Sequence, residues 1–353
     1  MNTPVRVLVV EDSPLFRRAI TSLLSLDPDI QVVGTAVDGR EAIDLVSKLR
    51  PDVITMDIHL PTMDSLEATR QIMAYHPTPI LILSSSTTKE GQGTIFQALE
   101  YGALDVFPKV TLEISKDPQS LGRELAARIK MLARVRVVTH PLAKFQRIHK
   151  DKPTLSRDLD RRRILAIGAS TGGPQALRTI FRSLPSGLPC RVLVVQHIAA
   201  GFAEGLAGWL DEESDMEVVL ATNGVSLRPG VAYVAPTQLQ MRAGRAGILC
   251  LTDEDPCEGH KPSASILFES VADVYGEGAV GVILSGMGKD GTRGLRQLKA
   301  ASGIVLAQDE ATSVIFGMPK AAIEAGVVDE VLPIEQMAEA ISRVVNSDLS
   351  VKV

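Results

Sequence analysis

The sequence is poor in cysteine and has no long hydrophobic run. Its three cysteines, Cys190, Cys250 and Cys257, show no CxxC spacing and cannot all pair, which disfavours a disulfide framework and a cysteine-based zinc site. A reducing compartment is therefore expected. No apolar run approaches the roughly 20 residues that span a bilayer, and the N-terminus lacks the pattern of a secretory signal. We expect a cytoplasmic protein without membrane insertion.

Positive charge is not in excess either. Lysine and arginine number 37 against 42 aspartate and glutamate residues, which gives a formal net charge of −5. Such a chain has no general attraction to nucleic acid or to anionic lipid. What the sequence does have is 353 residues, 45% of them hydrophobic and 22% charged. This length and composition are typical of a globular protein with two domains.

Residues 1–134 alternate short apolar strands with amphipathic helices. Near-continuous apolar runs suit parallel strands that are buried on both faces, and the segments between them are long enough for crossover helices. The pattern predicts a doubly wound, five-stranded, flavodoxin-like α/β domain. The expected strands are Val5–Val10, Ile30–Gly34, Val53–Met56, Ile80–Leu83 and Leu104–Phe107.

A second α/β series occupies residues 163–353. The segment before it, residues 135–162, has little apolar periodicity and is interpreted as a linker. We expect a mostly parallel sheet, with a glycine-rich, β-rich insertion near residues 217–260. The expected strands are Ile164–Gly168, Val192–Gln196, Val280–Leu284, Ile304–Ala307 and Val327–Leu332.

Polar residues follow the strands of the first domain. Glu11 and Asp12 come after the first strand and Asp57 after the third, so their carboxylates should meet at one sheet edge and could hold Mg²⁺. One carboxylate could then attack a phosphoryl group, because the metal offsets charge repulsion. Ser84 and Lys109, after the fourth and fifth strands, could engage the phosphoryl oxygens. Each residue alone would be interpreted as a cap or turn residue, but the whole set is hard to explain that way.

These residues stand in strings that resemble the receiver domain of two-component response regulators. The strings are Val9–Ser13, Met56–Pro61, Ser84-Ser85 and Lys109, and the resemblance covers about residues 4–134. It implies that Asp57 accepts a phosphoryl group from a histidine kinase. It also implies that Glu11, Asp12 and Asp57 bind Mg²⁺, with the backbone carbonyl of His59 as a further ligand. Ser65 and Val110 depart from the glycine and proline that are usual in the family.

The second domain opens with a candidate nucleophile. Residues 168–172 match G-x-S-x-G, a sharp strand-to-helix turn that exposes the hydroxyl of Ser170. Backbone N–H groups at such a helix N-terminus can stabilise an oxyanion. Alone, the motif is equally typical of a phosphate cradle or of a simple turn.

A candidate base and a candidate acid also follow strands of this domain. His197 comes after the second strand and Asp290 after the third, so both could meet Ser170 at one sheet edge. A serine needs an imidazole to take its proton, and the imidazole needs an acceptor to fix its tautomer. The Ser–His–Asp chain order differs from that of the α/β-hydrolase family, which excludes that family. Asp290 could equally be a turn cap, and His260, before a helix capped by Ser263, is a competing histidine with a structural or substrate-lining role.

This half resembles the catalytic domain of the CheB chemotaxis methylesterases over about residues 163–345. The matching strings are Ile167–Gly173, Gln196-His197, His260–Ser263, Leu284–Gly291, Gln308–Ser313 and Phe316–Pro319. The resemblance implies Ser170 as nucleophile, His197 as base and Asp290 as orienting acid, with Thr171 and Met287 lining the site, Met287 near the oxyanion.

The resemblance also sets expectations for substrate, partners and cofactors. The substrate would be γ-glutamyl methyl esters of chemoreceptors, with glutamine deamidation as a second activity and no cofactor for hydrolysis. The phosphodonor would be a CheA-type histidine kinase. Ala199-Ala200 and Thr237-Gln238 depart from the family's usual residues and bear on substrate specificity. The alternatives are a DNA-binding response regulator, which would need a basic helix-turn-helix module, and an inactive module that only competes for a kinase.

Overall fold

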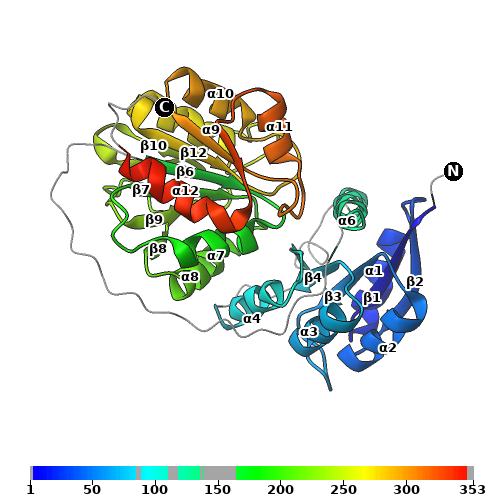
Figure 1. Ribbon diagram of the computed structural model, residues 1–353. Coiled ribbons are helices and arrows are strands. Elements are labelled where there is room, and N and C mark those ends of the chain that lie inside the picture. The colour runs from blue at the N-terminus through cyan, green and yellow to red at the C-terminus, as the bar shows by residue number, and fades with distance from the viewer. Residues whose placement is uncertain (1–2, 85–88, 110–117, 136, 138–163, 348–353) are drawn as a thin grey trace. The chain divides into compact units, whose positions relative to one another are not determined.

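Two compact units, residues 1–147 and 148–353, make up the chain in the computed structural model (Figure 1). The structure describes residues 3–84, 89–109, 118–135, 137 and 164–347. The expected linker therefore lies almost wholly outside the described residues, as does Val110. No helix of the described part is both long enough and apolar enough to cross a membrane.

The first unit is a five-stranded parallel sheet in the order β2-β1-β3-β4-β5, which confirms the predicted doubly wound fold. Helices α1 and α6 pack against each other, whereas α3 packs against α2 and α4. The strands are β1 Val5–Val10, β2 Ile30–Ala36, β3 Val53–Asp57, β4 Ile80–Ser84 and β5 Asp105–Pro108. The helices are α1 Pro14–Leu24, α2 Gly39–Leu49, α3 Ser65–Tyr75, α4 Lys89–Glu100 and α6 Pro118–Leu132.

The second unit contains a seven-stranded, wholly parallel sheet in the order β14-β13-β12-β6-β7-β9-β8. Helices α7, α8 and α12 cover one face, and α9, α10 and α11 cover the other (Figure 1). The strands are β6 Ile164–Ala169, β7 Arg191–Gln196, β8 Glu217–Leu220, β9 Val231–Val234, β12 Ala279–Ile283, β13 Ile304–Gln308 and β14 Glu330–Leu332. The helices are α7 Gly173–Ser183, α8 Ala203–Glu213, α9 Ala264–Tyr275, α10 Thr292–Ala300, α11 Met318–Glu324 and α12 Ile334–Asn346.

The insertion near residues 217–260 divides between two sheets. Strands β8 and β9 join the main sheet, while β10 Gln240–Ala243 and β11 Leu249–Thr252 form a separate antiparallel hairpin. The hairpin packs against α9. Its inward side chains, including Met241 and Leu249, belong to the same apolar core as Phe268 of α9. The hairpin thereby brings the loops around residues 237–239 and 253–261 to the N-terminal end of α9.

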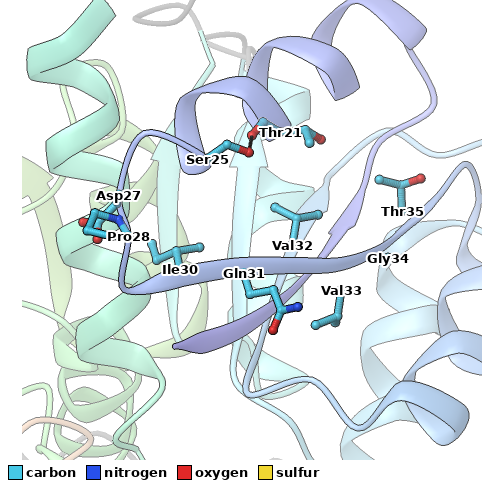
Figure 2. Close-up of a pocket in the computed structure, with 10 residues that line it drawn as sticks. All are labelled: Thr21, Ser25, Asp27, Pro28, Ile30, Gln31, Val32, Val33, Gly34 and Thr35. Carbon is cyan, nitrogen blue, oxygen red and sulfur yellow. Dashed lines mark hydrogen bonds between the residues drawn. The ribbon is translucent and has the colours of Figure 1, made fainter. Parts of the chain in front are cut away.

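A surface hollow of ≈ 570 Å³ lies along β2, the edge strand of the first sheet. Figure 2 shows it lined by small polar and aliphatic side chains, with Ser25 donating to the carbonyl of Thr21. Its one carboxylate, Asp27, is already paired with Lys130 at 2.7 Å. The hollow therefore lacks a converging set of reactive groups, and the candidate sites lie elsewhere, at the carboxyl ends of the strands.

Candidate functional site

Both sheets reverse their strand order at the point where the candidate residues gather. In the first sheet β2 and β3 lie on opposite sides of β1, and in the second β7 and β12 lie on opposite sides of β6. At such a switch point the connections leave toward opposite faces and open a crevice at the carboxyl ends of the strands. In the first sheet Glu11 follows β1 and Asp57 ends β3, and in the second Ser170 follows β6, His197 follows β7 and Asp290 lies in the loop after β12.

The three acidic residues of the first unit lie together at its switch point. One carboxylate oxygen each of Glu11, Asp12 and Asp57 lies within 4.8 Å of the others. Glu11 and Asp57 are buried, whereas Asp12 is exposed. Such an oxygen-only set, open to solvent on one side, suits a hard cation that keeps several waters.

Lys109 binds the two buried carboxylates. Its Nζ lies 2.6 Å from Glu11 Oε2 and 2.6 Å from Asp57 Oδ2. Burial raises the pKa of Glu11, the hydrogen bond from Lys109 opposes that rise, and the Asp57 charge adds to it. This buried cation thus neutralises part of a dense negative cluster.

The remaining receiver residues surround this cluster. The amide of His59 donates to Asp57 Oδ1 at 3.2 Å, while the side chain of His59 is exposed. Ser84 is buried at the end of β4, and its carbonyl accepts from the Lys109 amide at 2.7 Å. Ser65, the departure from glycine, donates from Oγ to the Ile58 carbonyl at 2.6 Å. A serine is accommodated there because a buried carbonyl beside Asp57 accepts its hydroxyl.

The loop of Ser170 is a tight turn that requires glycine. Gly172 has a φ of 78°, and a Cβ there would lie 2.5 Å from Cβ of Val314. A Cβ on Gly173 would lie 2.0 Å from Gln196 Oε1. Helix α7 begins directly afterwards, with Pro174 in its first turn. The sequence Ser-Thr-Gly-Gly-Pro therefore places Ser170 between the end of β6 and the start of α7.

Parallel pairing continues past the strands and aligns the three loops. The Ser170 amide donates to the Ser285 carbonyl at 3.0 Å, and the His197 amide donates to the Ala169 carbonyl at 2.9 Å. The buried side chain of Gln196 donates to the carbonyls of Ser170 at 2.7 Å and of His197 at 3.0 Å. The nucleophile loop is thus tied to the loop of the candidate base on one side and of the candidate acid on the other.

His197 and Asp290 form a direct pair. His197 Nε2 lies 2.9 Å from Asp290 Oδ2, and the His197 side chain is only 10% exposed. Among the described residues Nδ1 of His197 is buried and has no hydrogen-bond partner. A neutral ring that donates from Nε2 to Asp290 carries its lone pair on Nδ1. In this ring orientation, Nδ1 is the atom that can accept a proton.

Asp290 is held as a carboxylate by donors from the start of α9. Its oxygens accept from Ser263 Oγ at 2.8 Å and from the amides of Ala264, Ser265 and Gly291 at 2.7, 3.0 and 2.8 Å. Burial alone would raise the pKa of Asp290, but the bonds from His197, Ser263 and Ser265 outweigh it and hold the pKa well below its usual range. The positive end of the helix dipole acts in the same direction.

Thr171 and Met287 lie on the two loops that flank the candidate nucleophile. Thr171 is buried and its carbonyl accepts from Ser285 Oγ at 2.7 Å, whereas Met287 is 55% exposed. Gly286, which precedes Met287, runs so close to Ser170 that a Cβ on it would lie 2.7 Å from Ser170 Cβ. The amide of Met287 makes no hydrogen bond within the described part of the chain. That places an available donor near Ser170.

Two features of this region were not predicted from the sequence. The ring of His260 stacks on that of His197, with centroids 4.0 Å apart. Gln238 adopts a φ of 69°, in the left-handed region that favours glycine, and it lines a hollow of ≈ 700 Å³ with Thr237, Asp253 and Lys261. No sequence pattern predicts either feature, because both arise from loops whose placement depends on the β10–β11 hairpin.

Known proteins match both units of the chain. Residues 7–114 match the model of the response regulator receiver domain, and residues 165–341 match that of the CheB methylesterase. A relative from Nitrosospira multiformis named protein-glutamate methylesterase/protein-glutamine glutaminase is 42% identical, with 97% of each chain covered. One of the same name from Pyrococcus horikoshii is 40% identical over 98% of this chain and 95% of its own.

A solved structure also matches the second unit. The crystal structure of the Thermotoga maritima CheB methylesterase catalytic domain is 38% identical, covers 52% of this chain and 98% of its own, and has a TM-score of 0.50. Where a DNA-binding regulator would need a basic helix-turn-helix module, residues 164–347 form an α/β unit. The chain belongs to the CheB methylesterase family and carries an N-terminal response regulator receiver domain.

Proposed function

We propose that this protein hydrolyses γ-glutamyl methyl esters on cytoplasmic chemoreceptor helices, with Ser170 as nucleophile. The observation that carries the proposal is the buried His197–Asp290 pair, 2.9 Å apart, on the loops tied to either side of the Ser170 turn. The names of the full-length relatives support the same activity. An inactive module that only competes for a kinase would have no use for a buried, fully bonded carboxylate behind a histidine.

Acylation follows from the orientation of the imidazole. As Ser170 Oγ attacks the ester carbonyl carbon, its proton passes to Nδ1 of His197, and the resulting imidazolium is stabilised by Asp290 through Nε2. The oxyanion that forms accepts from backbone donors beside the serine, and the amide of Met287 is the candidate donor. His197 then gives its proton to the methoxide oxygen, so methanol leaves and an acyl-serine remains.

Deacylation repeats these steps with water. Water loses a proton to Nδ1 of His197 as it attacks the acyl carbon, and the proton returns to Ser170 Oγ when the glutamate carboxylate is released. A primary amide presents the same carbonyl carbon, with ammonia as the leaving group. Glutamine deamidation is therefore proposed as a second activity, and neither reaction needs a cofactor.

The receiver unit is proposed to regulate this activity. Asp57 would accept a phosphoryl group from a CheA-type histidine kinase, while Glu11, Asp12 and Asp57, with the His59 carbonyl, would hold Mg²⁺. The bound ion would offset the repulsion between the carboxylate and the incoming phosphoryl group. Lys109, whose buried Nζ lies 2.6 Å from Asp57, and Ser84, at the end of β4, would bind the phosphoryl oxygens.

The test is release of methanol from methylated receptors by purified full-length protein. Ser170→Ala removes only the attacking oxygen, so the fold should remain and the rate should fall by up to about 10⁶-fold, as in related triads. Folded Ser170→Ala protein that retains more than a small fraction of the wild-type rate would refute the assignment.

A further inference from the structure

His260 and His197 form a face-to-face pair of imidazoles. Their ring centroids lie 4.0 Å apart and their planes differ by 3°. The two residues come from different loops, one after β7 and the other between the β10–β11 hairpin and α9. A parallel stack at van der Waals distance lets one ring restrict the tilt of the other.

The backbone of His260 is fixed from both sides. Its amide donates to the Cys257 carbonyl at 2.9 Å, and its carbonyl accepts from the Cys257 amide at 3.0 Å. Glu258 and Gly259, between them, have φ values of 51° and 85°, which is the tight turn typical of a hairpin. This turn holds the histidine in place before any substrate binds.

A buried glutamine also fixes this segment through hydrogen bonds to its backbone. Gln240 of β10 is fully buried; its Nε2 donates to the His260 carbonyl at 3.2 Å and its Oε1 accepts from the Ser263 amide at 2.8 Å. Ser263 in turn donates to Asp290. One short segment, residues 260–263, therefore supplies both a ring against His197 and a hydrogen bond to its acidic partner.

These contacts restrict two different motions of the base. The bond from Nε2 to Asp290 fixes one atom of His197, but a ring held at one atom can still swing about it. A second ring stacked on its face removes that motion and so fixes the direction of Nδ1. We propose that His260 is a positioning residue that holds the imidazole plane of His197 so that Nδ1 faces the reacting serine. The proposal rests on the function proposed above for His197.

A substrate-binding role and a positioning role for His260 predict different kinetics. A residue that only binds substrate would change KM with little change in kcat, whereas a residue that aims the base would change kcat. A displacement of a reacting group by about 1 Å can lower the rate by about 100-fold. The stack needs a flat ring and no particular charge, so phenylalanine should replace histidine and glutamine should not.

The test compares His260→Phe with His260→Gln in the full-length protein. We expect His260→Gln to lower kcat for methanol release by about 10- to 100-fold with KM nearly unchanged, and His260→Phe to recover most of that loss. Glu258→Gln, on the same turn but with an exposed side chain, controls for disturbance of the loop and should match wild type. Equal rates for the Phe and Gln variants, or a change confined to KM, would overturn the proposal.

Crystal structures of both variants test the geometry without relying on activity. In His260→Phe the His197 ring should keep its plane and its bond to Asp290, and in His260→Gln the ring should rotate or spread over several orientations. An unmoved ring in His260→Gln would refute the proposal even if the rate changed. If instead the ring moves as expected but wild type and Ser170→Ala release methanol equally, the proposed function fails and the positioning contact stands.

Discussion

At the scale of single residues, Asp290 has a side chain whose surroundings admit little change. It is 1% exposed and accepts from one hydroxyl, three amides and the imidazole of His197. Every one of these partners donates a hydrogen bond. Only a carboxylate, whose two oxygens both accept, can therefore satisfy all of them. The same contacts that orient the base therefore also contribute to folding.

Asp290→Asn should accordingly impair both catalysis and stability. The amide nitrogen would face N–H donors, which leaves at least one buried donor unpaired and costs about 1–3 kcal/mol. The imidazole would lose the acceptor that fixes its tautomer, a change that costs about 10⁴-fold in kcat in the serine-protease example. Urea unfolding followed by the fluorescence of the only tryptophan, Trp209 in α8, reports on this unit. Asp273→Asn, on the exposed side of α9, is the matched control and should change neither quantity.

The lowered pKa of Asp290 also gives a pH dependence. Because the pKa in the folded protein lies below that in the unfolded chain, the stabilisation is present above about pH 3.9 and is lost as the pH falls below it. Wild type should lose stability more steeply than Asp290→Asn as the pH falls from about 4 to about 2, measured again by Trp209 fluorescence in urea. Parallel losses in the two proteins would show that the carboxylate is not the group concerned.

Ser65 provides a prediction for the receiver unit. Its hydroxyl is buried and donates to the Ile58 carbonyl at 2.6 Å, so Ser65→Ala should lower the free energy of unfolding by about 1 kcal/mol. Ser47 donates to the Asp44 carbonyl at 2.8 Å on the solvent side of α2, so Ser47→Ala should cost much less. Because the receiver unit contains no tryptophan, its unfolding is to be followed by calorimetry rather than by fluorescence. Equal costs for both variants would mean that burial of the Ser65 hydroxyl adds nothing.

At the scale of elements, the turn between β6 and α7 depends on the left-handed backbone of Gly172. Gly172→Ala would force a Cβ both into a positive φ and against Val314, so we expect a loss of about 1–3 kcal/mol and a large fall in kcat. Gly208, inside α8, would have no other atom within 4 Å of an added Cβ, and alanine there should stabilise the helix by about 0.5–1 kcal/mol. The changes in the free energy of unfolding caused by Gly172→Ala and Gly208→Ala should therefore have opposite signs. The midpoints of urea unfolding measure both.

The strands were the part of the fold most directly predictable from the sequence. A parallel strand covered on both faces must be a short, continuous apolar run, and β1 is found at its expected bounds, while β6 and β7 differ by one residue. Polar residues that follow such strands then lie close together, because the carboxyl ends of neighbouring parallel strands lie at the same edge of the sheet. That is why the pairing of His197 with Asp290, on loops hydrogen-bonded to that of Ser170, could be predicted from the order of strands and polar residues.

Three features were not predictable in this way. Apolar content alone does not say which sheet a strand joins, so the division of residues 217–260 between the main sheet and the β10–β11 hairpin was missed. The stack of His260 on His197 depends on that hairpin and on a turn with two positive φ values. The final strand is also shorter than expected, Glu330–Leu332, because the preceding residues complete the turn after α11.

At the scale of the whole molecule, the chain joins a receiver unit to a methylesterase unit, each with its own sheet. The residues proposed for hydrolysis, Ser170, His197 and Asp290, all lie within residues 164–347, so this chemistry needs no second domain. The attachment is best explained if phosphorylation of Asp57 controls access to Ser170. A phosphoryl group adds negative charge beside Lys109, which now pairs with Glu11 and Asp57, and re-pairing of that lysine would change the surface of the receiver unit.

This coupling predicts how activity depends on the receiver unit. Since the unphosphorylated receiver would restrain the hydrolase, a fragment of residues 163–353 should release methanol faster than the unphosphorylated full chain. Mg²⁺ with a small phosphodonor such as acetyl phosphate should activate the full chain, because phosphorylation of Asp57 would relieve that restraint. Asp57→Ala and the fragment should not respond, and both serve as controls for direct effects of the phosphodonor. A fragment slower than the full chain, together with no response to the phosphodonor, would rule out gating while leaving the assignment of Ser170 intact.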